Sequence, residues 1–172
     1  MTQTVSYEIT GQIGEIEFRK YPRLVLATVM SPGNDSGFNL LFSYITGKNR
    51  TKRQIQMTAP VITSEQIPMT APVVSDEKSM SFVMPSGKEQ DEIPDPLDER
   101  VKITAQDPRE MAVIRFKGYA GREDVNDVTS RLLEALQKGG ITTRGQPVLM
   151  RYNAPWTPGF LRRNEAGIEI TR

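Results

Sequence analysis

The residue types that the chain lacks limit the chemistry it can perform. Its 172 residues include no histidine and no cysteine. This composition excludes a Cys/His zinc site, a cysteine-ligated iron–sulfur cluster and a covalent c-type haem attachment. It also excludes a Ser–His–Asp triad and a cysteine nucleophile. Carboxylates, lysine, tyrosine and hydroxyl groups remain for catalysis, and no metal site is predicted.

The most distinctive pattern is a short repeat that contains two methionines. Residues 54–61, QIQMTAPV, recur as residues 66–73, QIPMTAPV, twelve positions later. This repeat is too short for a solenoid, whose units have ~20 residues or more. The copies could place Met57 and Met69 on the wall of a pocket for a flat apolar ligand, because thioethers pack well on aromatic faces. Alternatively, both methionines fill an irregular part of the core.

A second candidate surface is an apolar stripe with the spacing i, i+3, i+4 and i+7, which predicts an amphipathic helix. Its members are Phe38, Leu41, Phe42 and Ile45. Leu40 and Tyr44 widen the apolar surface beyond this stripe. Part of the helix could therefore face a ligand cleft, although a helix buried against the core is the plainer interpretation.

A basic segment follows this predicted helix. It contains Lys48, Arg50, Lys52 and Arg53. At the mouth of a cleft these cations could pair with the carboxylates of a ligand. The alternative is a solvated loop with no role in binding.

Carboxylates and a single tryptophan are further candidates. Glu17 and Glu169 each lie between two apolar residues of an alternating segment, so each points to the face opposite its neighbours. Either could point into a central cavity, although a solvated face is the commoner place for a carboxylate. Trp156 lies in a proline-rich loop that could cover a ligand or be pinned to the surface. Arg163 and Glu165 could form a local ion pair, worth little if exposed.

Composition places the chain among ordinary globular proteins. It is 37% hydrophobic and 25% charged, and its length suits one domain over residues 1–172. The balance of 22 basic and 21 acidic residues argues against a nucleic-acid-binding protein. No apolar run approaches ~18 residues, so no membrane span is predicted. Because residues 1–10 do not resemble a secretory signal, the cytoplasm is the expected compartment.

The periodicity of the chain predicts two similar halves, at about residues 14–85 and 101–171. Each half has the order strand, strand, helix, strand, strand. The predicted strands include residues 15–21, 24–29, 80–84, 101–105, 111–119, 148–152 and 168–170, and the predicted helices cover residues 38–45 and 123–138. This order predicts an α+β fold in which both halves build one curved sheet or barrel with a helix from each half packed on it.

The two repeat copies are predicted to be irregular extended segments. Pro60 and Pro72 lie inside them. Because proline has no N–H group for a strand ladder, neither copy is expected to form a full central strand.

Four segments together resemble the SOUL haem-binding protein family. They are residues 37–49, the two Met-Thr-Ala-Pro-Val copies, Ser81-Phe82-Val83-Met84-Pro85, and Arg151-Tyr152-Asn153-Ala154-Pro155-Trp156 continuing to Arg162-Arg163-Asn164-Glu165. They extend over nearly the whole chain and keep the order of the family. The resemblance implies a distorted β-barrel of two similar halves with two packed helices, which agrees with the periodicity.

The same resemblance implies that a tetrapyrrole binds in a cleft beside the first helix. Carried onto this chain, the cleft would involve Phe38, Leu41, Phe42 and Ile45, with Met57 and Met69 as further apolar candidates. Nearby cations, Lys48, Arg50 and Lys52, would meet the propionates. Some members are thought to use an axial histidine, which this chain does not have. Haem iron would then be held by methionine or tyrosine, or the porphyrin would bind through its faces and propionates alone.

Three functions remain open at this point. The first is a small-molecule binding protein whose ligand is haem or another tetrapyrrole. The second is a module for another apolar or cationic small molecule, built around Glu169 or Glu17, because the barrel plan also resembles bacterial effector-binding domains in which a buried carboxylate matters. The third is a hydrolase that pairs Glu169 with Tyr152, although nothing in the sequence requires an enzyme. The sequence leaves the physiological ligand and the oligomeric state open.

Overall fold

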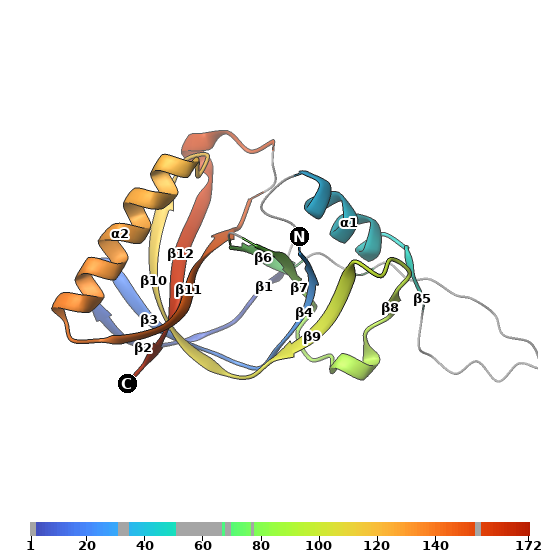
Figure 1. Cartoon of the computed structure of the whole chain (residues 1–172), viewed down its shortest axis with the longest axis horizontal. Helices are drawn as coiled ribbons and strands as arrows, with labels where there is room; N and C mark the ends of the chain where they lie inside the picture. Colours follow the sequence, from blue (N-terminus) through green and yellow to red (C-terminus); the bar gives the residue numbers. More distant parts are fainter. Residues whose placement is uncertain (1–2, 31–34, 51–66, 68–69, 77, 154–155) are drawn as a thin grey trace, which may run out of the picture.

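A curled, ten-stranded sheet dominates the structure, and one helix covers each of its halves (Figure 1). The computed structural model describes residues 3–30, 35–50, 67, 70–76, 78–153 and 156–172. The predicted α+β class with two packed helices is confirmed. Within the described residues neither helix is long and apolar enough to cross a membrane.

The predicted order of elements is present in both halves. The first half contains β3 (Ile16–Tyr21), β4 (Leu24–Val29), α1 (Asp35–Ile45), β6 (Thr70–Ser75) and β7 (Met80–Val83). The second half contains β9 (Val101–Gln106), β10 (Arg109–Lys117), α2 (Arg122–Lys138), β11 (Thr142–Arg151) and β12 (Arg163–Thr171). Outside this pattern lie β1 (Gln3–Thr4), β2 (Glu8–Ile13), β5 (Asn49–Arg50), β8 (Asp95–Pro96) and the 3-10 turns η1 (Gln90–Glu92) and η2 (Gly159–Leu161).

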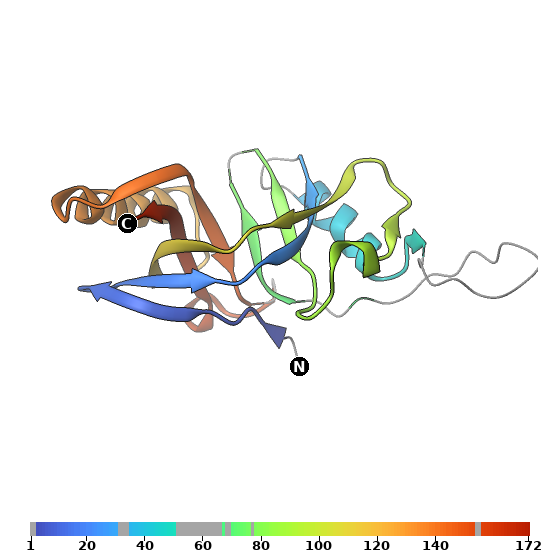
Figure 2. The ribbon, with the colours of Figure 1, turned by 90° about the horizontal axis from the view of Figure 1, so that it is seen from below.

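The two halves interlock because each supplies a strand to the other. The sheet has the order β2-β3-β10-β12-β11-β6-β7-β4-β9, and its tenth strand, β1, pairs with β6 off this path. Thus β3 pairs with β10 of the second half, and β9 pairs with β4 of the first. β3 and β4 both belong to the first half but lie in different parts of the sheet, and only two residues separate them, as the blue strands of Figure 2 show. No pairing among the described residues joins β2 to β9, so the sheet is a curled open sheet and not a closed barrel.

Alternation along the strands divides the sheet into an outer and an inner face. On the outer face, Val25, Ala27 and Val29 of β4 pack with Leu41 and Tyr44 of α1. The outer face of the other half packs against α2 through a separate cluster: Ile16, Phe18, Ala112, Ile114, Val128, Leu132, Leu136, Ala166, Ile168 and Ile170. Each helix therefore has its own core.

A third apolar cluster lines the inner face, where the two halves meet. Its buried members are Val5, Tyr21, Val83, Met111, Val113 and Met150. They come from β3, β7, β10 and β11, together with the segment between β1 and β2. This inner face also holds the charged side chains that alternate with the outer apolar residues.

The prediction that the segment containing Pro72 does not form a central strand is wrong. Pro72 lies in β6, which pairs with β11 on one side and β7 on the other, and is therefore a central strand. The register between β6 and β7 shifts between Thr70 and Val73. Proline occupies this irregularity, where a missing N–H group costs the ladder least. Met57, Pro60 and Met69 lie outside the described residues.

Replacing Leu132 by alanine is expected to destabilise the protein by about 2 to 5 kcal/mol, because it leaves a cavity between α2 and the sheet. Leu132 is fully buried, whereas the neighbouring Leu133 is 37% exposed. Urea unfolding followed by circular dichroism measures the loss. The Leu133→Ala variant is the matched control and should lose much less; equal losses would contradict the packing described for α2.

Candidate functional site

The predicted apolar residues of α1 divide into two groups. Leu41 and Ile45 are 0% and 3% exposed and belong to the core beneath the helix. Phe42 is 46% exposed, and Phe38 is partly buried against the same core. Leu41 and Ile45 therefore fix the position of the helix, while Phe38 and Phe42 supply the part of it that a ligand could touch.

Phe38 and Phe42 form an ordered aromatic surface on α1. Their rings are stacked, with centroids 6.0 Å apart and an interplanar angle of 13°. Phe38 also makes an edge-to-face contact with the buried ring of Phe82 in β7, at 5.4 Å. Offset stacked and edge-to-face contacts are the favoured geometries of aromatic pairs. The exposed ring of Phe42 is thus held by a chain of aromatic contacts that reaches the core.

The structure places two of the predicted cations beyond the C-terminal end of this surface. The backbone N–H of Lys48 donates to the carbonyl of Ser43 at 2.9 Å, which brings Lys48 close to the turn that carries Phe42. Arg50 follows in β5, and both cations are exposed. Between them Asn49 is buried, and its amide donates to the carbonyl of Tyr44 at 2.8 Å. Lys52 lies outside the described residues.

Leu97 is an apolar neighbour that the sequence analysis missed. Its side chain is 53% exposed, and its N–H donates to the carbonyl of Lys48 at 3.2 Å. It directly follows β8, which pairs with β5. No periodic signal surrounds this single leucine, so only the pairing of β5 with β8 places it beside Lys48.

Potential iron ligands near α1 are few among the described residues. Tyr44 is 1% exposed, and its hydroxyl donates to the carbonyl of Pro94 at 2.6 Å, so it is not free to approach a ligand. Met30, which follows β4, is the only described methionine that is exposed, at 76%. Within the described residues no group of three or more Asp or Glu side chains is arranged to hold a metal ion.

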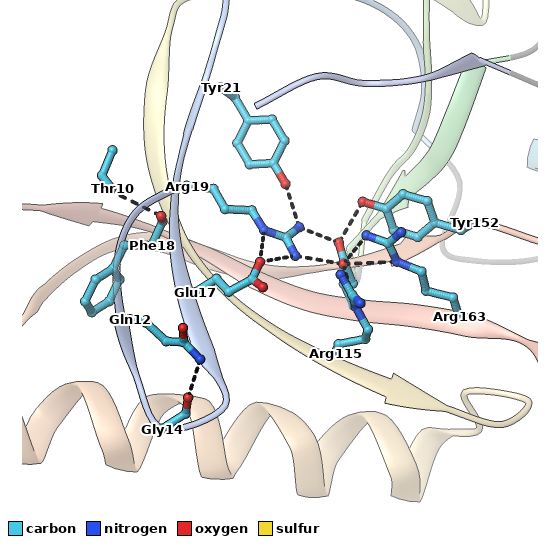
Figure 3. Close-up of polar contacts among 11 residues, drawn as sticks. Thr10, Gln12, Gly14, Glu17, Phe18, Arg19, Tyr21, Arg115, Tyr152 and Arg163 are labelled. Atoms are coloured by element: carbon cyan, nitrogen blue, oxygen red, sulfur yellow. Dashed lines mark hydrogen bonds and ion pairs between the residues drawn. The ribbon is translucent and has the colours of Figure 1, made fainter. Parts of the chain in front are cut away.

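The inner face contains a buried carboxylate, Glu165, for which the sequence predicted only a local ion pair with Arg163. Glu165 in β12 is 0% exposed, and Arg19 in β3, which Figure 3 labels together with Tyr152 and Arg163, makes a two-pronged contact with it. Nη1 and Nη2 of Arg19 donate to its two oxygens at 2.7 and 2.9 Å. The Tyr152 hydroxyl donates to Glu165 Oε2 at 2.6 Å, and Arg163 Nη2 donates to Oε1 at 2.8 Å. Both carboxylate oxygens therefore accept at least two strong hydrogen bonds.

These hydrogen bonds decide the protonation state of Glu165. Burial by itself would raise the pKa of this carboxyl, but the donors on Arg19, Tyr152 and Arg163 outweigh it and lower the pKa from 4.5 to about 2. Burial, together with the negative charge of Glu165, raises the pKa of Tyr152. Glu165 stays ionised and Tyr152 stays protonated at neutral pH.

Arg19 is itself fully enclosed by acceptors and an aromatic ring. Its Nε donates to Glu17 at 2.8 Å, and Nη1 donates to the Tyr21 hydroxyl at 3.2 Å. Its guanidinium also lies 4.1 Å from the centre of the Tyr7 ring. Glu17 therefore points to the inner face and pairs with Arg19, as its alternation with Ile16 and Phe18 allowed.

The pairing of Glu169 with Tyr152 that a hydrolase would need is not formed. Tyr152 donates to Glu165, and the neighbours of Glu169 are Arg109 and Arg144, with N–O distances of 3.8 and 3.9 Å. A protonated tyrosine whose pKa is raised is also a weak nucleophile. The geometry around Glu165 is that of a structural ion-pair network.

Weak signals for this network were present in the sequence. Glu17, Arg19 and Tyr21 alternate with apolar residues in a strand, which shows that they share one face. The strand predicted here covers only residues 168–170, whereas β12 begins at Arg163. The local ion pair expected between Arg163 and Glu165 is formed, at 2.8 Å. Arg19 and Glu165 are 146 positions apart, so their contact follows only from the pairing of β3, β10 and β12.

Trp156 and two apolar residues that follow it lie at the surface. Trp156 is 85% exposed, and Phe160 and Leu161 are 74% and 61% exposed. Gly159 between them is buried beneath Tyr119, where an added Cβ would meet the ring at 2.4 Å. The loop is therefore anchored through Gly159 and not through the tryptophan.

Comparisons with known proteins agree with this architecture. A protein family described as SOUL heme-binding protein matches residues 2–169. The chain is similar to Heme-binding protein 2 from Homo sapiens, with 34% identity over an alignment of 137 residues that covers 75% of this chain and 65% of the relative. It therefore spans somewhat less than two thirds of the length of that relative.

Two solved structures have a similar fold at low sequence identity. One is a hydrolase from Listeria innocua, with a TM-score of 0.57 and 9% identity over 94% of each chain. The other is the EcmrR C-terminal domain, with a TM-score of 0.58 and 10% identity over 96% of this chain and 98% of the other. At this identity the likeness concerns the fold alone.

Replacing Glu165 by glutamine is expected to destabilise the protein by about 3 to 5 kcal/mol, because Arg19 would remain buried without its main counter-charge. Chemical unfolding at pH 7 measures the change. Glu15→Gln is the matched control, since Glu15 is 59% exposed and pairs with the exposed Arg131. That variant should lose about 0 to 1 kcal/mol. Similar losses in both variants would show that the buried network stabilises the protein no more than an exposed ion pair does.

The lowered pKa of Glu165 also predicts a pH dependence of stability. A carboxyl with a pKa of about 4.5 unfolded and about 2 folded stabilises the protein fully above pH 4.5, and this contribution is lost as the pH falls towards 2. The melting temperature of the wild type should therefore fall more steeply between these pH values than that of Glu165→Gln. Parallel curves for the two proteins would overturn this assignment.

Proposed function

The chain belongs to the SOUL heme-binding protein family, and on this premise we propose that it binds haem or another tetrapyrrole at the exposed aromatic face of α1. The observation that carries the proposal is the stacked pair of Phe38 and Phe42, with Phe42 46% exposed on a helix otherwise anchored in the core. Flat aromatic ligands pack well on such rings. The name of the human relative, Heme-binding protein 2, supports the same ligand class.

Charge on one side of this surface suits the propionate groups of a tetrapyrrole. Lys48 and Arg50 are exposed and follow α1 directly, and Leu97 beside Lys48 adds apolar area. Arg50 is suited to pair with a carboxylate through two parallel hydrogen bonds. In this arrangement the ring system lies on Phe42 and the propionates point to β5.

The porphyrin would be held mainly by its faces and its propionates. The chain has no histidine or cysteine, and Tyr44 beside the surface is buried and donates to Pro94. Met30 is the one described methionine with an exposed thioether, so among the described methionines it alone could coordinate iron. When bound, haem would supply the iron chemistry, and the protein would supply binding and orientation. Lys52, Met57 and Met69, predicted to belong to the same site, stay part of this proposal.

Titration of the purified protein with hemin tests the proposal. A saturable shift of the Soret band is expected, and Phe42→Ala should weaken binding by about tenfold or more, because a stacking contact is lost. Arg50→Glu should weaken it as well, with a larger effect at low salt. Phe160→Ala removes an exposed ring at η2, away from the α1 surface, and is the control; Phe160 is 74% exposed and Phe42 46%.

The outcome of this titration is decisive for the surface proposed. If hemin gives no saturable shift, the ligand class is wrong. If binding persists unchanged in both Phe42→Ala and Arg50→Glu, the ligand binds elsewhere on the protein. Protoporphyrin IX without iron is a further probe, since binding through faces and propionates predicts a similar affinity for it.

A further inference from the structure

A cavity of about 330 Å³ lies on the inner face of the sheet, separate from the α1 surface. It is lined by Leu24 and Leu26 of β4, whereas Val25, Ala27 and Val29 of the same strand face α1. The two surfaces therefore lie on opposite faces of the sheet. Its volume is at the lower end of the range typical of small-molecule sites.

The wall of this cavity is apolar over one part and charged over another. The apolar part is contributed by Val5, Leu24, Leu26, Val74, Met111 and Met150. The charged part contains Arg109, Arg144, Glu169 and Asp76. Such a division fits an amphipathic molecule with an apolar body and one polar head.

Arg109 has an unused hydrogen-bond donor at this wall. Among the described residues, its Nε is the buried side-chain polar atom without a hydrogen-bond partner. Its Nη1 lies 3.8 Å from Glu169 Oε2, an ion pair longer than a hydrogen bond. A buried donor left unsatisfied costs free energy, which an acceptor on a bound molecule would recover.

The local charge favours an anionic head. The lining as a whole is neutral, with two arginines and two carboxylates, but next to Arg109 two guanidinium groups share the single carboxylate of Glu169. Arg144 is 78% exposed, whereas Arg109 is only 21% exposed and is poorly solvated. Burial outweighs the nearby negative charge and lowers the pKa of Arg109, in agreement with an incompletely compensated guanidinium. The other carboxylate of the wall, Asp76, is engaged with the N–H groups of Lys78 and Ser79.

We propose that this cavity is a second binding site, for a small carboxylate with an apolar body, and that Arg109 binds the carboxylate. The aliphatic part of the ligand would lie against Leu26, Val74 and Met150. The site does not depend on tetrapyrrole binding, because no residue of the α1 surface lines it.

Isothermal titration calorimetry with octanoate tests this site, with octan-1-ol and octyltrimethylammonium as matched neutral and cationic probes. Octanoate is expected to bind saturably and at least about tenfold more tightly than either analogue, because hydrogen bonds between charged groups are the stronger ones. Arg109→Met should remove this preference. Glu169→Gln should strengthen octanoate binding, because it removes the competing carboxylate.

Two further variants keep the test independent of folding and of the α1 surface. Val74→Phe, which fills the apolar part, should weaken octanoate binding if Arg109→Met is unstable. Phe42→Ala should leave octanoate binding unchanged while it weakens hemin binding, so the two proposals fail separately. The site is overturned if octanoate does not bind, if octan-1-ol or octyltrimethylammonium binds as tightly, or if folded Arg109→Met and Val74→Phe both bind octanoate normally.

Discussion

The ion pair between Arg19 and Glu165 is the contact on which the arrangement of the two halves depends. Arg19 is 1% exposed and Glu165 is 0% exposed, and neither charge could be buried without the other. Arg19 comes from the first half, while Glu165, Tyr152 and Arg163 come from the second. The network forms only when β3 pairs with β10, so it stabilises one specific register of the interlocked strands.

The curl of the sheet gives its two faces different roles. The outer face is covered by α1 and α2, each with its own apolar cluster. The inner face has no helix among the described residues, and it brings apolar side chains and charged groups together between the halves. A charged residue can lie there only with partners, which explains why Glu17, Arg19 and Glu165 form one connected network.

Because the chain has no histidine, the proposed tetrapyrrole site relies on aromatic contacts and charge in place of an axial histidine. The family of this chain is described by haem binding, yet the most familiar axial ligand is absent from the sequence. What α1 offers instead is a ring exposed to solvent and held by stacking on Phe38 and through it on Phe82. Recognition of this kind depends on the shape and charge of a ligand more than on its metal, so iron-free porphyrins are equally reasonable ligands.

The sequence by itself determined the local elements and the faces of the strands. The stripe at Phe38, Leu41, Phe42 and Ile45 predicted α1, and the alternation around Glu17 and Glu169 correctly indicated a face opposite to the outer core. These features are periodic, and periodicity is set by the geometry of a helix or strand over a few residues. The two similar halves and the family followed from the order of such elements and from short motifs.

Only the tertiary structure decided which face was enclosed and which residues met there. The sequence paired Glu165 only with its neighbour Arg163, and its main partner Arg19 is 146 positions away, so no local pattern could join them. Likewise, Leu41 and Phe42 are adjacent in sequence, but packing against the sheet buries one and exposes the other. The curl of the sheet turns the polar face of each strand towards the other half, and this long-range pairing cannot be read from residues that lie close together in the chain.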